Sequence, residues 1–381
     1  MGIKYYLIGL IKAILRCFFI FKIRPKTVLF SAYSGKQYSC NPKYICEFLL
    51  KETKDDLEIV WAFNDPNEFN NIDPRIKKIK FKSLKFIYYA LTSRVVVDNV
   101  ESWSILPRRK GQAVINTWHG GGAYKGVGLR REDTNALQDK NMINKHKRVN
   151  YYVSSSKAFT KMTLRDSFKY KGKVIECGMP RNDILIRYSQ EKVNSIKRRL
   201  DLDNDTKIVI YAPTFRNSKS SNYEIDADAV LKALSDKTGK KWKMLYRSHY
   251  YVTDKNMSDN NIIDVSAYPD MQELLLISDV LITDYSSSIW DFSLMKKPAF
   301  LFANDLKEYK NERDFYTPIE EWPYPMSETM EELIQTIMDY DKEKAEIRIN
   351  KHHAALKSCE TGNASKIIGN MIIRKCCKGN K

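Results

Sequence analysis

Short apolar segments rich in β-branched residues alternate along most of the chain with segments of helical periodicity. This alternation is typical of parallel sheets whose strands are joined by crossover helices. In the first half we expect helices over residues 42–52 and 82–92, each between two strands. The strands predicted for this half are residues 27–33, 58–63, 94–98, 113–118, 150–155 and 173–178.

The same alternation restarts after a charged, weakly apolar stretch at residues 190–206. The chain has 381 residues, which suits two domains of ordinary size better than one core. We therefore expect an α/β fold with two lobes, over residues 26–205 and 206–381, and terminal helices that could pack back on the first lobe. The strands predicted for the second lobe are residues 207–212, 241–246, 279–283 and 298–302.

The N-terminal segment is apolar over residues 5–21, but Lys12 and Arg16 interrupt it. Its uncharged stretches are too short to span a bilayer. At about 100° per residue, Lys4, Lys12 and Arg16 fall on one side of a helix and leave apolar residues on the rest. Residues 1–25 are therefore predicted to form a basic amphipathic helix that lies on an anionic membrane surface. The alternative is a helix packed against the protein's own core.

The formal charge of +18, from 64 Lys and Arg against 46 Asp and Glu, predicts an anionic partner. Charge alone does not choose among nucleic acid, anionic lipid and a phosphorylated substrate. The seven cysteines are scattered and show no metal-binding spacing, which favours reduced thiols in the cytoplasm. No acidic metal cage is visible in the sequence, and we expect neither a metal nor a cofactor.

A glycine run directly follows the predicted strand at residues 113–118. Gly120 and Gly121 allow the main chain to approach a ligand closely, and Lys125 adds a cation. His119 lies at the carboxyl end of the strand, where open α/β sheets bind ligands. Because imidazole titrates near neutrality, His119 could accept the proton of an attacking hydroxyl. The alternative is a turn histidine that only binds the backbone.

The segment GMPRND follows another predicted strand and ends at Asp183. Arg181 could bind a phosphate with its planar guanidinium group. Asn182 and Asp183 could contact the same ligand, or could equally cap a helix.

Two further segments follow strands of the second lobe. After Pro213, Thr214 and Arg216 present a hydroxyl and a cation that could contact phosphate, although a turn and a surface ion pair would also explain them. Arg247 and His249 are two residues apart and share a face if the strand continues. Together they could neutralise a diphosphate and assist departure of the nucleotide.

Three serines, Ser286, Ser287 and Ser288, follow a strand and precede an apolar helical segment. A helix N-terminus of this kind favours an anion, whereas simple capping requires only one serine. Asp284 would repel phosphate, so we expect it to orient a neighbour or to bind a ribose hydroxyl.

The five histidines differ in whether they follow a predicted strand or lie in a helical segment. Only His119 and His249 follow predicted strands. His352 and His353 are adjacent in a lysine-rich helical segment and are predicted to be solvated.

Taken together, these segments resemble the CDP-glycerol glycerophosphotransferases, the teichoic-acid and capsule polymerase family of bacteria. Each motif alone is weakly specific, but the five in this order are highly specific. They are WHG at 118–120, GMPRND at 178–183, YAPTFR at 211–216, RSH at 247–249 and the segment at 273–298.

The resemblance implies a glycosyltransferase-B-like fold with two Rossmann-like lobes, at the cytoplasmic face of the membrane. It implies CDP-glycerol or CDP-ribitol as the donor, a lipid-linked or polymer acceptor, and release of CMP. His119 corresponds to the family's candidate base and His249 to its phosphate stabiliser. One departure is the glycine-rich WHGGGAYK at 118–125, where the family often has WHGTP-x-K.

Two other functions remain as alternatives. An enzyme of the same architecture could transfer a sugar from a nucleotide-sugar donor, and the product would distinguish the two. The charge and the tyrosine content would also suit a nucleic-acid-binding protein, but the sequence has no recognised nucleic-acid motif and its basic residues are spread widely. Glycerol and ribitol, and the primase, polymerase and capsule-linking roles, all remain open.

Overall fold

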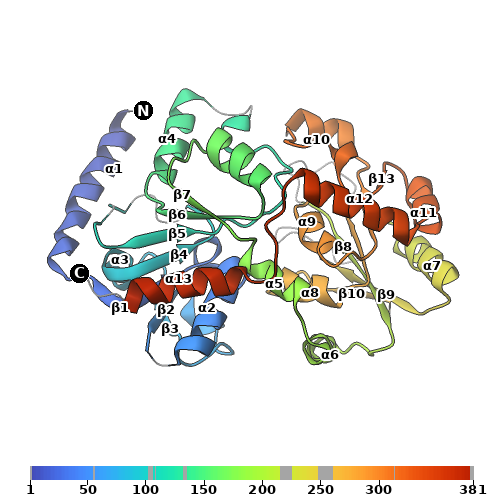
Figure 1. Cartoon of the computed structure of the whole chain (residues 1–381), viewed down its shortest axis with the longest axis horizontal. Helices are drawn as coiled ribbons and strands as arrows, with labels where there is room; N and C mark the ends of the chain where they lie inside the picture. The colour runs from blue at the N-terminus through green and yellow to red at the C-terminus, as the bar shows by residue number, and fades with distance from the viewer. Residues whose placement is uncertain are drawn as a thin grey trace. The chain divides into compact units, whose positions relative to one another are not determined.

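The computed structural model describes residues 2–54, 56–101, 106–107, 109–131, 135–214, 225–247, 261–312 and 314–377. The chain forms two compact α/β units (Figure 1). The first contains Met1–His119, Asp133–Asp183 and Cys359–Lys381, and the second contains Gly120–Glu132 and Ile184–Ser358.

The division between the units differs from the expected boundary near residue 205, because the chain enters the second unit after Asp183. Helix α6 (Gln190–Arg199) is held there by ion pairs to Glu273 of helix α8 (Met271–Ile277). The Glu273 carboxylate lies 2.8 Å from Lys192 Nζ and 2.7 Å from Arg199 Nη2. The charged stretch at residues 190–205, which was assigned to the first lobe, is therefore part of the second unit.

The first unit is built on a seven-stranded parallel sheet in the order β3-β2-β1-β4-β5-β6-β7. The strand order reverses at β1, so the switch point lies between β1 and β4. Six strands match the predictions, whereas the edge strand β3 has a single apolar residue in KKIK and was not predicted. The strands are β1 (Arg24–Phe30), β2 (Glu58–Phe63), β3 (Lys77–Lys80), β4 (Ser93–Asp98), β5 (Ala113–Asn116), β6 (Tyr151–Ser154) and β7 (Lys173–Glu176).

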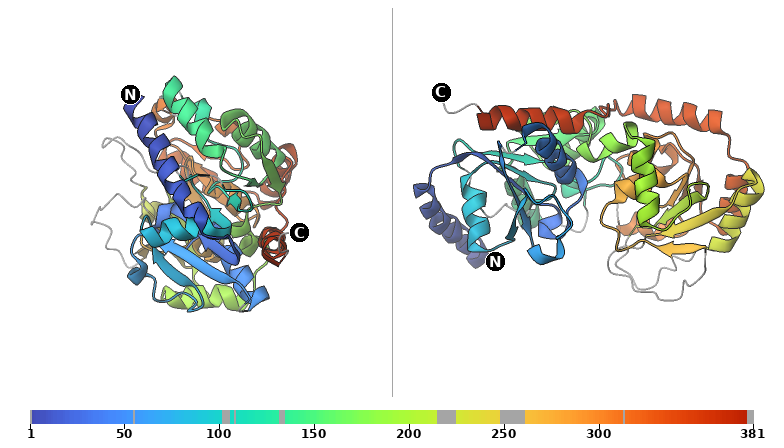
Figure 2. Two further views of the ribbon diagram at one scale, coloured as in Figure 1. Left: turned by 90° about the vertical axis from the view of Figure 1, so that its left-hand side faces the viewer. Right: turned by 90° about the horizontal axis from the view of Figure 1, so that it is seen from below.

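Helices cover both faces of this sheet. The C-terminal helix α13 packs on β1, β4 and α2 (Figure 2), and a Cβ atom at Gly369 would clash with the Phe48 ring. The last helix of the chain therefore belongs to the first unit. The helical elements of this unit are α1 (Gly2–Leu15), η1 (Arg16–Ile20), η2 (Tyr33–Gly35), α2 (Cys40–Thr53), η3 (Pro66–Glu68), α3 (Leu84–Thr92), α4 (Ala136–His146), the π-helical η5 (Phe159–Ser167), η6 (Pro180–Asn182) and α13 (Ala364–Cys377).

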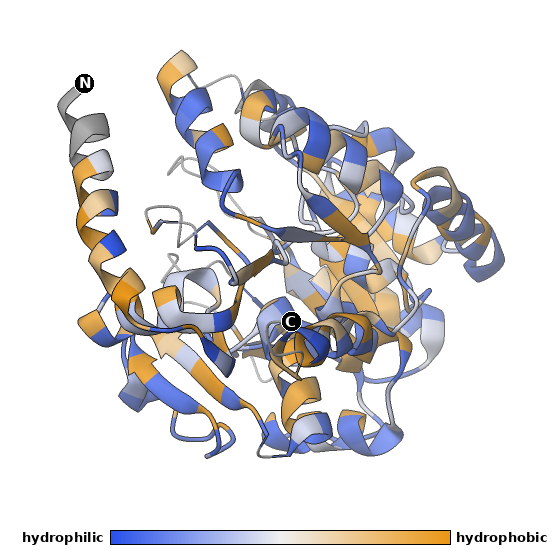
Figure 3. Ribbon diagram, turned by 60° about the vertical axis from the view of Figure 1, so that its left-hand side comes forward, coloured by the Kyte–Doolittle hydropathy of each residue, from blue (hydrophilic) through white to orange (hydrophobic). Residues whose placement is uncertain are grey.

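The N-terminal helices α1 and η1 have one packed side and one exposed apolar side. Leu15 is buried in the core of the first unit, where Phe18 and Phe19 also pack. Leu10 and Ile14 are both 58% exposed. Figure 3 shows apolar positions (orange) along the described part of α1. No helix among the described residues is long and apolar enough to cross a bilayer.

The second unit contains a six-stranded parallel sheet in the order β10-β9-β8-β11-β12-β13, with its switch point between β8 and β11. The four predicted strands are present. The edge strands β10 and β13 were not predicted, since each is too short to show a period. The strands are β8 (Lys207–Ala212), β9 (Trp242–Tyr246), β10 (Ile262–Asp264), β11 (Val280–Thr283), β12 (Ala299–Phe302) and β13 (Met326–Ser327).

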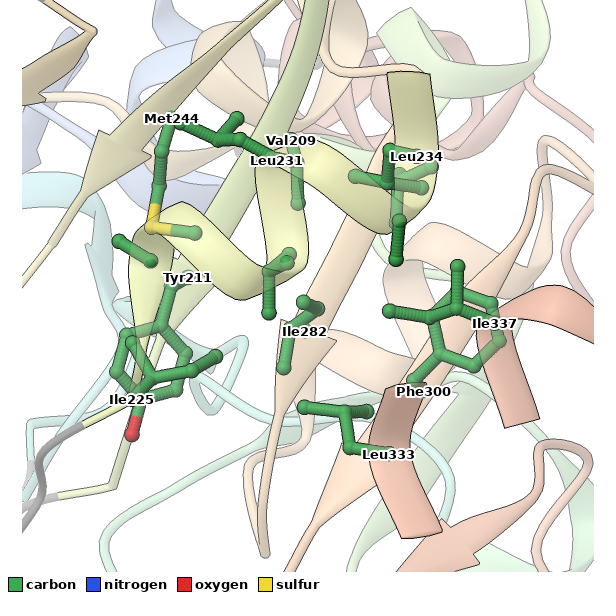
Figure 4. Packing of buried hydrophobic residues seen from close by; sticks show 14 of the residues in the cluster. Val209, Tyr211, Ile225, Leu231, Leu234, Met244, Ile282, Phe300, Leu333 and Ile337 are labelled. Carbon is green, nitrogen blue, oxygen red and sulfur yellow. The ribbon is translucent and has the colours of Figure 1, made fainter. Parts of the chain in front are cut away.

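The core of the second unit lies between this sheet and two amphipathic helices (Figure 4). Leu231 and Leu234 of α7 and Leu333 and Ile337 of α11 pack on the strand residues, which include Ile282. These buried apolar side chains fix the sheet whose carboxyl edge carries the polar residues described below. The helical elements of this unit are η4 (Gly128–Arg130), α5 (Asp183–Ile186), which begins at the unit boundary, α6, α7 (Ala227–Thr238), α8, α9 (Ser288–Ser293), α10 (Leu306–Glu312), η7 (Ile319–Glu321), α11 (Met330–Met338) and α12 (Lys342–Ala355).

Candidate active site

His119 lies beyond the carboxyl end of β5 in the first unit. Its Nδ1 atom is 2.9 Å from the backbone oxygen of Asn99, the residue that follows β4. Because a carbonyl oxygen only accepts hydrogen bonds, Nδ1 carries the proton and Nε2 keeps the lone pair. The rings of Tyr33 and Trp118 pack against the imidazole, with centroids 5.7 and 4.4 Å away. The ring is thereby oriented by three neighbours.

The environment of His119 keeps the imidazole neutral. Burial lowers the pKa to about 4, the hydrogen bond to Asn99 opposes this shift, and the nearby charge of Arg181 adds to it. At pH 7 the side chain is therefore unprotonated, which is the form that a general base requires.

The loop that carries His119 is held by Asn41, at the start of α2. Asn41 Nδ2 donates to the backbone oxygen of Trp118 at 3.0 Å, and Asn41 Oδ1 accepts from the backbone N–H of Arg181 at 3.0 Å. Trp118 has a φ of 52°, a left-handed conformation that is unusual for a large side chain. One buried amide thus fixes two loops beyond the ends of two strands.

Arg181 lies next to His119, although the two residues belong to separate sequence motifs. Its Nη1 atom donates to the backbone oxygen of His119 at 2.7 Å, and its side chain is buried. The structure therefore brings together these two predicted site residues of the first unit.

Asn182 and Asp183 contact the C-terminal segment. Asn182 Nδ2 donates to Glu360 at 3.0 Å. The carboxylate of Asp183 accepts from the backbone N–H groups of Ala364 and Ser365, at 2.9 and 2.7 Å, and so caps α13. The structure shows that Asp183 caps a helix from the far end of the chain, whereas Asn182 bonds to Glu360. Contact of either residue with a ligand stays a prediction.

In the second unit, Thr214, Asp284 and Lys125 form one cluster at the switch point between β8 and β11. The Asp284 carboxylate accepts from the Thr214 backbone N–H at 2.9 Å and from its hydroxyl at 2.6 Å. Lys125 Nζ donates to Thr214 Oγ1 at 3.5 Å and lies over the Tyr309 ring. Asp284 therefore orients a neighbour, which was one of its two predicted roles, and the half-buried Pro213 precedes the cluster.

The serines lie at the start of α9. Ser288 donates from its backbone N–H and from its hydroxyl to Ser286 Oγ, at 3.2 and 3.0 Å. Ser287 occupies the N-cap position without a side-chain capping bond. Ser286 and Ser287 are half-buried, and their binding of an anion stays a prediction.

The glycine-rich loop of the second unit packs on Trp290 of α9. A Cβ atom at Gly121 would lie 2.5 Å from Trp290 Cδ1, and Gly122 has a φ of 80°. Gly120, which precedes them, is half-buried. The loop therefore needs glycine at position 121 for close approach and at position 122 for its backbone conformation.

The same region corrects the prediction for His352 and His353. His352 is buried, its Nε2 atom lies 2.9 Å from the Tyr124 hydroxyl, and its pKa is lowered to about 4 by burial. His353 Nε2 lies 2.7 Å from Ser293 Oγ. The prediction of solvated side chains was wrong, because His352 is buried and the His353 ring packs on Trp290, although the lysines of α12 are exposed.

Arg247 is half-buried, and its Nη1 atom donates to the Tyr268 backbone oxygen at 2.8 Å. Two predicted site residues, Arg216 and His249, lie outside the described residues.

Sequence reasoning missed Asn41 and Asn99. Asn99 directly follows a predicted strand, so the position rule that selected His119 could have found it. Asn41 opens a helix and carries no comparable signal, since its contacts lie 77 and 140 positions away.

Two α/β units, each built on a parallel sheet with polar residues beyond the carboxyl ends of its strands, define a glycosyltransferase-B-like fold. The chain belongs to the CDP-glycerol:poly(glycerophosphate) glycerophosphotransferase family, whose model matches residues 13–374.

Similar proteins agree with this assignment. A teichoic acid poly(glycerol phosphate) polymerase of Bacillus spizizenii is 32% identical, over 90% of both chains. A teichoic acid glycerol-phosphate transferase of Staphylococcus aureus is 29% identical, over 91% of this chain and 92% of that protein. The Bacillus subtilis poly(glycerol phosphate) polymerase is 31% identical, and the aligned region covers 92% of this chain but only 49% of that protein.

Solved structures show the same fold. The wall teichoic acid polymerase TagF, as a histidine-to-asparagine variant with CDPG, superposes with a TM-score of 0.82 and 30% identity, over 93% of this chain and 90% of that one. The TagF structure without a named variant gives a TM-score of 0.83 and 28% identity, over 98% and 95%.

Proposed function

We propose that this chain transfers glycerol phosphate, or another polyol phosphate, from a CDP-polyol donor to a hydroxyl of a membrane-linked acceptor and releases CMP. This reaction would extend a polymer of the teichoic-acid or capsule type. The family match and the names of the similar proteins support the donor class, since they include both glycerol-phosphate and ribitol-phosphate enzymes. The observation that carries the proposal is the neutral imidazole of His119 with its proton on Nδ1.

In the proposed step, Nε2 of His119 accepts the proton of the acceptor hydroxyl. The acceptor oxygen forms a bond to the phosphorus that bears the polyol, and the bond between that phosphorus and the CMP oxygen breaks. The electron pair of the broken bond leaves with CMP. A pKa near 4 makes His119 a weak base in the free protein, but the negative charges of a bound diphosphate would raise it.

The cations of the site would neutralise the donor. Lys125 would bind phosphate oxygens in the second unit, and Asp284 would serve by holding the Thr214 hydroxyl rather than by touching the phosphate. Ser286, Ser287, Arg216, Arg247 and His249 stay predicted donor contacts.

The exposed apolar side of α1 and η1 supports association with the membrane. Ile20 is 80% exposed, and Leu10 and Ile14 are exposed on the preceding helix, close in sequence to Lys12 and Arg16. Apolar side chains flanked by cations suit the surface of an anionic bilayer. We propose that this segment holds the enzyme at the cytoplasmic face without spanning the membrane.

A donor screen tests the reaction. Purified protein is incubated with CDP-glycerol, CDP-ribitol or a nucleotide sugar, together with a lipid-linked acceptor, and the release of CMP is followed. We expect release from a CDP-polyol and polyol phosphate in the product. Release from neither CDP-polyol by folded protein with several acceptors, or sugar in the product, would overturn the proposal.

The variant His119→Ala tests the proposed base. We expect CMP release to fall by at least about 100-fold, the usual contribution of general base catalysis, while thermal unfolding stays close to that of the wild type. Full activity in this variant would remove His119 from the role of base.

A further inference from the structure

A cavity of about 750 Å³ lies in the first unit, away from His119. Its lining includes Tyr151 at the start of β6 and Lys173 at the start of β7, so it opens at the amino ends of these strands. His119 follows the carboxyl end of β5. Because β5, β6 and β7 are parallel, the cavity and His119 lie at opposite edges of the sheet. The volume is within the range of small-molecule sites.

The cavity is strongly cationic. Among the described residues, its lining contains four lysines and no acidic residue. Within the described part of the chain, no carboxylate forms an ion pair with any of these lysines, which are Lys147, Lys169, Lys171 and Lys173. A concave surface of one charge concentrates ligands of the opposite charge.

The lysine-bearing loop is fixed by its own hydrogen bonds. Arg165 Nη1 donates to the backbone oxygens of Tyr170 and Gly172, at 2.7 and 3.0 Å. The Tyr170 hydroxyl donates to the backbone oxygen of Lys173 at 3.2 Å. The alternating lysines of residues 169–173 are therefore carried by an ordered backbone.

A buried imidazole also lines the cavity. His146 is 1% exposed, and its Nδ1 atom lies 2.7 Å from the Tyr152 hydroxyl. Its Nε2 atom has no hydrogen-bond partner among the described residues. A buried polar atom without a partner costs free energy that a bound ligand would recover.

We propose that this cavity binds the phosphodiester of a glycerol-phosphate unit, at a second site distinct from the reacting centre. The lysines would neutralise the phosphate, and Tyr151 and the Nε2 atom of His146 would contact polyol or phosphate oxygens. The choice of glycerol phosphate rests on the proposed function, since the reaction produces such units. Glycerol-phosphate units occur in the growing polymer and, with the same chemistry, in the headgroup of phosphatidylglycerol.

The test compares the full chain with Lys171→Gln/Lys173→Gln, which removes two charges from exposed positions of the cavity. The matched control is Lys351→Gln/Lys366→Gln, which removes two charges from exposed positions elsewhere. The probes are a short soluble oligo(glycerol phosphate), vesicles of phosphatidylcholine with and without phosphatidylglycerol, and an RNA oligonucleotide with the same number of phosphates.

We expect the cavity variant to bind a glycerol-phosphate probe about tenfold more weakly than the control variant. A loss of affinity for the soluble oligomer alone identifies the growing polymer as the ligand. A loss of affinity for phosphatidylglycerol vesicles alone identifies the lipid headgroup as the ligand. We also expect the ring resonances of His146 to shift when the soluble oligomer or inorganic phosphate is added. Equal affinities of the two variants for both probes, an equal loss for RNA, or binding without any response of His146 would overturn the proposal.

The reaction with a minimal acceptor separates this inference from the proposed function. We expect both variants to release CMP at the wild-type rate with an acceptor too short to reach the cavity. If the wild type releases CMP but the cavity variant binds the glycerol-phosphate probes as tightly as the control, only the proposal of a second site fails. If the wild type releases no CMP, the proposed function itself fails.

Discussion

Arg181 Nη1 donates a hydrogen bond of 2.7 Å to the backbone oxygen of His119, although the two residues are 62 positions apart. The contact fixes the loop of the candidate base and places a positive charge near its imidazole. That charge acts in the same direction as burial, because both disfavour the protonated ring. Arg181 is therefore expected to be a positioning residue that also tunes the protonation of His119.

Replacing Arg181 should change the pH dependence of transfer. The base must be unprotonated, so kcat/KM should fall as the pH decreases through the pKa of His119, near 4 in the free protein. In Arg181→Met the positive charge is absent, the pKa of His119 rises, and the acid limb should move upward by no more than about one pH unit, since burial remains the main cause. The measurement is kcat/KM for CMP release between pH 4 and 8.

Arg181→Lys provides the matched control. It retains the charge but not the planar group, so its acid limb should stay near that of the wild type while kcat decreases. An acid limb that is the same in Arg181→Met and in the wild type would contradict the assigned electrostatic role.

The positions of several site residues were predictable, because a parallel sheet places the carboxyl ends of its strands at one edge. The runs before His119, Arg181, Thr214 and Asp284 are apolar and β-branched, and each of these side chains lies beyond the strand that precedes it. The edge strand β3 was missed because a lysine-rich strand has no apolar period. A period-based method therefore finds central strands more readily than edge strands.

The partners of the site residues could not be predicted in the same way. Asp183 caps a helix that begins 181 positions later, and the glycine loop packs on Trp290. Such contacts depend on how distant elements pack, and nothing in the local pattern encodes them. Local chemistry suggested that Asp183 could bind a ligand or act as a cap, and only the packing of α13 shows which helix it caps.

Asp183→Ala should reduce stability more than it reduces transfer. The change removes the acceptor for the backbone N–H groups of Ala364 and Ser365, and loss of a helix cap costs about 1 kcal/mol. Urea unfolding measures this loss. Asp183→Asn retains one carbonyl acceptor and should lose less. Unchanged stability together with abolished CMP release would instead show that Asp183 acts on the substrate.

Gly121→Ala should be destabilising because the new methyl group would lie 2.5 Å from Trp290 Cδ1. Trp290 is fully buried, so the overpacking should cost about 1–3 kcal/mol. Gly9→Ala is the matched control, since nothing lies within 4 Å of an added Cβ atom there. In a Trp290→Phe background the cost of Gly121→Ala should be smaller, and additive effects in this double-mutant cycle would exclude the contact as the cause.

Acid should destabilise the second unit through His352. Burial lowers its pKa from the ordinary 6.5 to about 4 in the folded protein, so the unfolded chain takes up a proton first as the pH falls. The stabilising contribution of the neutral ring is complete above about pH 6.5 and is lost progressively toward pH 4, by about 2 kcal/mol at pH 5. His352→Gln keeps a neutral hydrogen-bonding side chain opposite Tyr124. Urea unfolding at pH 7.5 and pH 5 should therefore show a smaller acid-induced loss in the variant than in the wild type. Equal losses in the two proteins would mean that His352 is already protonated, or is exposed, in the folded state.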